Sequence, residues 1–280
     1  MTGAVQRIAD LSILIFVVST MLAMGMSQRL AEVVAPLQRP LTVVLALAVN
    51  FILAPLFALV LSRIIPLQPG HAVGLLLLGA AAGAPFLPKL AELCGGNLAY
   101  AVTLMVLLMG GSTLFMPFVL PLLVPGLTAE PWIIAKPLVL YMMIPLGTGF
   151  ALALSRLSWV ERVLPFVRAL SNLALVLLVV LLVGLNLKTV LSTFGSFAVA
   201  SYTLYLLALI AAAWVLGAAE RLTRNVFALG AGCRNIPAAF VVARESFDDP
   251  ATQVMLVVAF VVSLVVLLPL ARAMRPTAGL

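Results

Sequence analysis

The sequence has very few charged residues. They occupy only 9% of its 280 positions, whereas a soluble domain carries about 25%. Aliphatic, aromatic and Cys residues together make up 64% of the chain, well above the roughly 45 to 50% of soluble proteins. A soluble protein of this length needs polar loops and charged helix faces. The composition therefore excludes a soluble protein. It predicts a protein that resides in a lipid bilayer.

Histidine and cysteine are also scarce, with one and two residues respectively. Cys94 and Cys233 lie in or beside apolar runs, so neither a disulfide framework nor a metal cluster is indicated. The histidine, His71, falls at the edge of an apolar run, where we expect it to be solvated. The sequence contains no nucleophile–base pair, carboxylate pair, phosphate loop or metal-ligand spacing. We therefore expect neither an enzyme nor a protein that needs a cofactor or metal ion.

The formal net charge is +7, which raises the question of nucleic-acid binding. The basic residues are spread over short segments between apolar runs and form no Lys/Arg stripe with interleaved aromatic residues. We therefore expect no nucleic-acid partner. The expected partner of these basic segments is the lipid bilayer, in particular its inner leaflet.

Apolar runs of roughly membrane-spanning length recur along the whole chain, bounded by Pro, Gly and charged residues. They predict an all-α polytopic membrane protein with nine transmembrane helices. The expected spans are residues 11–26, 40–62, 72–94, 98–122, 132–154, 165–187, 194–219, 223–243 and 251–271.

The distribution of basic residues predicts the orientation of these spans. With the N-terminus outside, nine basic residues fall in cytoplasmic segments and five fall outside, and the positive-inside rule favours that arrangement. The first run lacks a small-x-small cleavage site followed by a polar region, so we expect it to remain in the mature protein. We expect a bacterial inner membrane, with the C-terminus inside. The nine are Arg29, Arg39, Arg156, Arg162, Arg168, Arg221, Arg224, Arg272 and Arg275, and the five are Arg7, Arg63, Lys136, Lys188 and Arg244.

Two stretches in different halves of the chain share the pattern A-G-x-x-x-[LI]-P. One is residues 82–88 in the third span and the other is residues 231–237 in the eighth. The two spans run in opposite directions, so the match predicts an inverted-topology repeat of four plus five spans, with residues 1–125 as the first repeat and 126–280 as the second. A chance match is the alternative, because Gly, Ala and Pro are common in membrane helices.

Both stretches predict a break in the middle of a membrane helix. Pro88 and Pro237 each remove a backbone donor, and Gly83 and Gly232 precede them. Broken helices are tolerated in lipid only where they are buried in protein or line a cavity. Paired breaks in corresponding spans indicate the binding site of a transporter, where half-helix ends can hold ions of either sign.

The breaks carry the basic residues that we place deep in the membrane, Lys89 and Arg234. Such charges are costly in lipid and need partners. Three interpretations remain open. In the first, Glu92 pairs locally with Lys89 and Arg234 bonds the broken backbone. In the second, both cations receive an anionic substrate. In the third, they are tethered cations that occupy the place of a metal ion.

Two asparagines are further candidates for this crossover. Asn50 lies in the second span and Asn235 lies within the second break. Each amide both donates and accepts hydrogen bonds. They can contact substrate or join helices structurally, and the sequence leaves both roles open.

Four motifs give the chain a resemblance to a known family. F-V-V-S-T-M-L-A-M-G-M-S begins at residue 16, V-N-F-I-L-A-P at 49, G-A-A-A-G-A-P-F-L-P-K-L at 79 and G-A-G-C-R-N-I-P-A-A at 230. In order and spacing they resemble the bile acid:sodium symporter family, within the wider superfamily that includes auxin efflux carriers. The resemblance implies interleaved panel and core domains, two unwound helices that cross, and alternating access.

The chain departs from the sodium-coupled members of that family. Where they carry a Ser-Asn pair in the first break, this chain has Leu87 and Pro88, and where they carry a Glu and a Gln around the second, it has Gly230 and Arg234. Residues 105–109 of the fourth span read M-V-L-L-M where sodium-coupled members are rich in hydroxyls, so no oxygen cage for a hard cation is apparent.

We therefore expect a secondary transporter of small organic anions that works by alternating access without sodium. Alternatives are a proton-coupled or exchange carrier that uses Glu92 as a proton or ion-pair partner, and a membrane sensor that binds ligand without transporting it. The sequence leaves the oligomeric state open.

Overall fold

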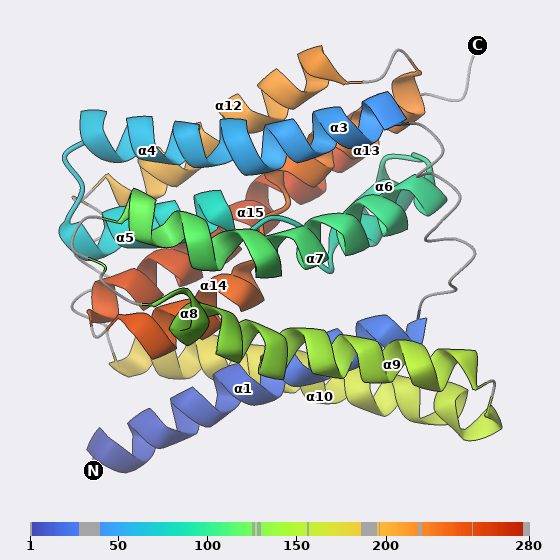
Figure 1. Cartoon of the computed structure of the whole chain (residues 1–280), viewed down its shortest axis with the longest axis horizontal. Helices are drawn as coiled ribbons and strands as arrows, with labels where there is room; N and C mark the ends of the chain where they lie inside the picture. The colour runs from blue at the N-terminus through green and yellow to red at the C-terminus, as the bar shows by residue number, and fades with distance from the viewer. Residues whose placement is uncertain are drawn as a thin grey trace.

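The computed structural model of the chain is built from helices (Figure 1). It describes residues 2–27, 40–124, 127, 130–155, 157–185, 195, 197–217, 220–247 and 249–276, and no strand occurs among them. The elements are α1 (Thr2–Ser27), α3 (Pro40–Ala48), η2 (Val49–Leu53), α4 (Ala54–Ile64), α5 (Pro69–Ala80), α6 (Leu87–Leu93), α7 (Leu98–Leu123), α8 (Pro131–Leu138), η3 (Val139–Met143), α9 (Ile144–Leu154), α10 (Ser158–Leu185), α12 (Ala198–Leu216), α13 (Arg221–Gly232), α14 (Ile236–Ser246) and α15 (Pro250–Ala273).

The helices follow the apolar runs of the sequence and confirm an all-α polytopic membrane protein. Among the described residues, five helical segments are long and apolar enough to cross a membrane. Large apolar side chains such as Leu122, Phe166 and Val215 face outward with 75 to 83% exposure, as expected for a lipid-facing surface. The count of nine spans stays a prediction. The five segments are Pro40–Ile64, Leu98–Leu123, Pro131–Leu154, Ala198–Leu216 and Pro250–Ala273.

Part of the predicted organisation falls outside the described residues. This holds for Arg29, Arg39, Arg156 and Lys188, on which the predicted orientation partly depends, and for the boundary between residues 125 and 126. The orientation and the repeat boundaries therefore stay predictions.

Two of the long helices contain a five-residue π-helical segment, and each is followed closely by a proline. η2 precedes Pro55 and η3 precedes Pro145, both within the first two positions of the next α-helix. Proline has no backbone N–H and cannot complete the regular hydrogen-bond ladder. A π-helical turn is one way in which a helix absorbs such an interruption, and such turns are frequent at functional sites.

The third and eighth predicted spans are broken, as expected. α5 ends at Ala80 and α6 begins at Leu87, while α13 ends at Gly232 and α14 begins at Ile236. Both glycines of the breaks are needed for close packing. A Cβ on Gly83, whose φ is +80°, would lie 2.5 Å from the backbone nitrogen of Met109, and one on Gly232 would lie 2.6 Å from Cγ1 of Ile210.

The helices form two groups (Figure 1). We name α1, α8–η3–α9 and α10 the panel helices and the others the core helices, and in Figure 1 α1, α9 and α10 lie together along one side of the molecule. Gly25 and Gly149 let α1 and α9 approach closely, because a Cβ on Gly25 would lie 2.2 Å from the Leu146 carbonyl oxygen. The core helices are α3–η2–α4, α5, α6, α7, α12, α13, α14 and α15. Most residues of α5, α13 and α14 are buried, including those next to the breaks, so the two breaks lie deep in the protein.

The prediction that His71 is solvated is wrong. α5 begins at Pro69, so His71 lies in its first turn and is fully buried. At this level α5 packs closely on the start of α15, where a Cβ on Gly70 would lie 2.3 Å from Oδ2 of Asp249. The neighbouring helix covers a residue that the apolar pattern placed at the membrane edge.

Candidate functional site

The two breaks lie against each other in antiparallel orientation. Ala82 and Arg234 form an isolated bridge, and the backbone nitrogen of Asn235 donates to the carbonyl of Ala81 at 2.9 Å. The Ser112 hydroxyl of α7 accepts from the Ala82 N–H at 2.7 Å and donates to the Ala82 carbonyl at 2.9 Å. These backbone groups of Ala81, Ala82 and Asn235 are thus satisfied within the protein, as lipid surroundings require. Sequence analysis did not single out Ser112, although a serine in the Gly110–Thr113 stretch of an apolar span is a signal for such a contact.

Arg234 lies at the centre of this crossing and is only 2% exposed. Its Nε donates to the Leu78 carbonyl at 2.8 Å, and its Nη2 donates to the Gly79 carbonyl at 2.8 Å. Its Nη1 donates to Oδ1 of Asn50 at 2.9 Å and to the Ala231 carbonyl at 3.2 Å. The guanidinium therefore binds four oxygen atoms from three segments of the core.

Three of these oxygens are carbonyls at helix C-termini, where a positive charge is stabilised. Leu78 and Gly79 belong to the last turn of α5, and Ala231 belongs to the last turn of α13. Helix C-termini carry a partial negative charge of about half a unit and leave carbonyls without intrahelical partners. The geometry favours the interpretation in which Arg234 is a tethered cation. It also agrees with the first interpretation, because Arg234 bonds backbone carbonyls at both breaks.

The two candidate asparagines support the crossing from different helices. Asn50, in η2, accepts from Arg234 and donates from Nδ2 to the Ala46 carbonyl at 3.0 Å. Asn235 is the N-cap of α14, and its Oδ1 accepts from the Ala238 N–H at 3.1 Å. The Nδ2 of Asn235 is buried and has no hydrogen-bond partner among the described residues. Both asparagines therefore hold the crossing together, and one retains a free donor.

Lys89 pairs with Glu92 rather than with the groups of the crossing, and its predicted depth in the membrane stays a prediction. Its Nζ pairs with Oε2 of Glu92 at 2.8 Å, and the two side chains are 62% and 51% exposed. Leu87, Leu90 and Ala91 form the buried face of α6, so helical periodicity turns Lys89 and Glu92 to the opposite face. The local pairing interpretation therefore holds for Lys89. Glu92 likewise does not reach the crossing.

The remaining candidates divide between the two breaks. Both prolines lie in the first turn of a helix, Pro88 in α6 and Pro237 in α14. Pro237 lines the cavity described in the next paragraph, and Pro88 is not among the described residues that line it. Gly83 and Gly232 act through backbone packing, as described above.

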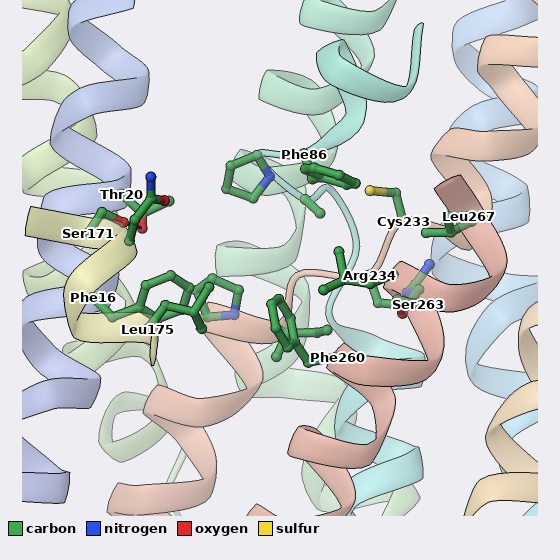
Figure 2. Close-up of a pocket in the computed structure, with 16 residues that line it drawn as sticks. Phe16, Thr20, Phe86, Ser171, Leu175, Cys233, Arg234, Phe260, Ser263 and Leu267 are labelled. Carbon is green, nitrogen blue, oxygen red and sulfur yellow. Dashed lines mark hydrogen bonds between the residues drawn. The ribbon is translucent and has the colours of Figure 1, made fainter. Parts of the chain in front are cut away.

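A cavity of about 330 Å³ lies between the panel and core helices beside the crossing (Figure 2). Most of its wall is apolar. Among the residues that the structure describes, Arg234 is the one charged residue of the lining and none of the lining residues is acidic. From the panel helices it is lined by Phe16, Thr20, Ser171, Asn172 and Leu175, and from the core by Ala84, Pro85, Phe86, Cys233, Arg234, Ile236, Pro237, Phe260, Ser263, Leu264 and Leu267.

Comparison with known proteins agrees with this architecture. The family model described as Sodium Bile acid symporter family matches residues 14–193, which include the first break and end before the second. No curated protein matches the chain. The match covers more than half of the sequence, and the family is made up of membrane transporters rather than enzymes. By this match the chain belongs to the Sodium Bile acid symporter family.

Proposed function

We propose that this membrane transporter is a secondary carrier of small organic anions and that it operates without sodium. The observation that carries the proposal is the set of four oxygens held by Arg234 at the crossing. Backbone carbonyls and an amide oxygen are the ligands that a hard cation requires. Here a side chain of the protein itself already binds them.

Local packing around the second break also argues against sodium. A Cβ on Gly230 would lie 2.7 Å from Cδ2 of Leu104 and 3.2 Å from Cδ2 of Leu87. The place where sodium-coupled relatives are expected to present a carboxylate is therefore filled by two leucine side chains. The residues of this chain do not fit a sodium site, because they supply hydrocarbon where oxygen ligands are needed.

Electrostatics opposes a further cation at the same place. Two unit charges of like sign repel by about 4 kcal/mol at 4 Å and an effective dielectric near 20. The guanidinium of Arg234 is only 2% exposed, so water screens it poorly. A sodium ion would have to displace this charge or lie beside it, and both are unfavourable.

The charges that line the cavity support an anionic substrate. Ile236 and Pro237 are the first two residues of α14 and line the wall, so the positive end of that helix dipole borders the cavity. The negative ends of α5 and α13 are offset by Arg234. The sum near the crossing is positive, and a low-dielectric site of positive potential favours anions. The apolar walls suit the body of an organic acid.

The position of the cavity supports transport by alternating access. The panel and core helices meet there, so displacement of one group against the other would open it toward either side of the membrane. Antiparallel pairing of the two breaks is the arrangement expected for an inverted repeat with residues 1–125 and 126–280 as its halves. We include this repeat, the N-out orientation and the interleaved panel and core domains in the proposal.

Uptake into proteoliposomes tests this function. A panel of carboxylates and matched amines identifies a ligand by thermal shift, because bound ligand stabilises the folded protein. Uptake of a binding carboxylate should then be unchanged when sodium is replaced by potassium or choline. A steep sodium dependence, or preference for amines, contradicts the proposal. Binding without any uptake would instead support the sensor.

A further inference from the structure

The end of the core at which α13 begins and α15 ends is strongly basic. The two helix ends are in contact, because Nδ2 of Asn225 donates to the Met274 carbonyl at 3.0 Å. Figure 1 shows α6, α13 and the C-terminus toward this end of the molecule. Among the described residues of these two helix ends, Glu220 is the one acidic residue. The basic residues there are Arg221, Arg224, Arg272 and Arg275.

Two of these arginines lie in the first turn of α13, where a positive charge is unfavourable. The N-terminus of a helix carries a partial positive charge of about half a unit and exposes N–H groups that have no partner within the helix. Acidic residues are favoured at such a position, but the first turn of α13 contains none. The carboxylate of the N-cap residue Glu220 accepts from the Thr223 hydroxyl at 3.0 Å and makes no cap hydrogen bond to the backbone. This helix end therefore favours an anion from outside the described chain.

Arg224 is positioned to bind such an anion. Its Cζ lies 4.3 Å from the centroid of the Trp214 ring, near the end of α12, so the guanidinium is stacked on an aromatic face. Its Nε is buried and has no hydrogen-bond partner among the described residues, and no hydrogen bond or ion pair joins the guanidinium to another residue in the described part of the chain. A guanidinium carries five donors in a planar fork that matches the oxygens of a phosphate group. Stacking on Trp214 fixes the plane of the fork and leaves its outer donors to bind.

An exposed apolar stripe runs along α12 and ends beside Arg224. Its side chains recur at intervals of three to four residues, which places them on one face of the helix. Trp214 and Val215 are 41% and 76% exposed, and tryptophan is typical of the interface between membrane and water. From Leu204 to Trp214 the helix rises about 15 Å, close to half of the roughly 30 Å hydrocarbon core of a bilayer. The stripe consists of Leu204, Leu207, Ala211, Trp214 and Val215.

We propose that the end of α12 and the start of α13 form a binding site for an anionic phospholipid. The headgroup phosphate binds Arg224, Arg221 and the first N–H groups of α13, and one acyl chain lies along the stripe of α12. A free anion would use the arginines but not the stripe, so the surface fits a lipid. In the proposed N-out orientation the lipid belongs to the cytoplasmic leaflet. The site is separate from the cavity and depends on neither substrate nor sodium.

Lipids with the same acyl chains and different headgroups test this site. Purified protein in detergent is titrated with dioleoyl phosphatidylglycerol, with dioleoyl phosphatidylcholine and with glycerol phosphate, which is the headgroup without acyl chains. Phosphatidylglycerol should raise the melting temperature by about 3–6 °C near saturation, because a ligand that binds the folded state stabilises it. The other two should raise it by less than about 1 °C. An equal response to phosphatidylcholine, or no response to any lipid, would refute an anionic lipid site, and an equal response to glycerol phosphate would reduce it to a site for free anions.

Variants place the lipid at α13. Arg224→Gln should raise the Kd for phosphatidylglycerol, measured by native mass spectrometry, about fivefold to tenfold, because it removes a charge that binds the phosphate. Trp214→Leu keeps the apolar stripe but removes the aromatic face under the guanidinium, so it should raise the Kd by a smaller factor. Both side chains lie at least partly at the surface, so the variants should fold. Unchanged affinity in Arg224→Gln would refute the assignment.

Two other arginines are matched controls. Arg272 is exposed at the same end of the core, and Arg272→Gln should raise the Kd by about twofold or less, since it removes general attraction to the leaflet but no phosphate contact. Arg63 is exposed in the last turn of α4, which leads into α5 beside the start of α15, at the opposite end of the core. Arg63→Gln should leave the Kd unchanged. Equal losses in Arg272→Gln and Arg224→Gln would mean diffuse attraction without a site, and a loss confined to Arg63→Gln would place the lipid at the other end; either result overturns the proposal.

Discussion

The two helix breaks share a sequence pattern, and a basic residue lies within the second break and just after the first, yet the two residues have opposite surroundings. Arg234 is 2% exposed and binds four oxygens at the crossing. Lys89 is exposed and pairs with Glu92 on the surface of α6. A basic residue near a break is thus a weak indicator of a site. Its position relative to the helix ends decides whether it reaches the partner break.

The reason for this difference is local. Arg234 lies between the last residue of α13 and the N-cap of α14, where the extended chain pairs with Ala82 of the other break. Lys89 follows Pro88 in the first turn of α6. The buried face of this helix is formed by other residues. The first break is longer, from Ala81 to Phe86, and carries no charge. The second break therefore supplies the cation, and the end of α5 supplies two of the four oxygens that it binds.

Replacement of the central cation should produce the largest effect. Arg234→Gln removes the charge and leaves the Leu78 and Gly79 carbonyls without donors, and charge-assisted hydrogen bonds contribute about 1.5–3 kcal/mol each. We expect the melting temperature of purified protein to fall by roughly 5–10 °C. The freed carbonyls, the amide oxygen of Asn50 and the new glutamine oxygen would form an oxygen cage, so sodium should restore part of the loss.

The unmodified protein is the control for that experiment, and its melting temperature should not respond to sodium compared with potassium. If sodium stabilises both proteins equally, Arg234 does not occupy a cation position. If Arg234→Gln melts at the original temperature, the four hydrogen bonds contribute little to stability.

The glycines of the two breaks offer a second comparison. Gly83→Ala should destabilise more than Gly232→Ala. At Gly83 the φ of +80° is unfavourable for alanine and the new Cβ would meet backbone of α7, whereas at Gly232 it would meet the side chain of Ile210, which can shift. Strain of this kind costs about 1–3 kcal/mol. Thermal unfolding of both variants measures the difference, and an equal loss would contradict the stated geometry.

Much of the fold could be predicted from sequence because the bilayer leaves few choices. Apolar runs set the helices, and Pro88 and Pro237 set the breaks, since a proline in lipid needs a buried environment. The periodicity of α6 and the spacing of Lys89 and Glu92 could also have placed that pair on the surface. His71 shows the limit, because only the position of α15 determines that it is buried.

The site itself depends on contacts between distant segments. Arg234 meets Leu78 and Gly79 at sequence separations of 156 and 155 residues, and Thr20 meets Ser171 across 151 residues. Neither pair has a local signature. The residue types that could bind ions were visible in the sequence, but which of them share a cavity depends on how the panel and core helices pack.

A smaller effect is expected at the hydroxyl that supports the first break. Ser112→Ala removes the partner of both the N–H and the carbonyl of Ala82, and a buried group left without a partner costs about 1–3 kcal/mol. Thermal unfolding should show a loss below that of Arg234→Gln. Thr113→Val is the control, because Thr113 bonds only the Met109 carbonyl of its own helix. A larger loss in the control would assign the effect to general packing of α7.

The smallest effect should come from the surface pair, and it completes the comparison of the two breaks. Exposed ion pairs contribute about 0–1 kcal/mol, and Lys89 and Glu92 are 62% and 51% exposed. Lys89→Gln and Glu92→Gln should therefore leave the melting temperature within about 2 °C of the original and leave carboxylate affinity unchanged. Uptake driven by a pH gradient should also be the same in Glu92→Gln as in the unmodified protein, because Glu92 does not reach the crossing. A selective loss of pH-driven uptake in that variant would revive the proton-coupled alternative and would mean that α6 moves its exposed face toward the substrate path during transport.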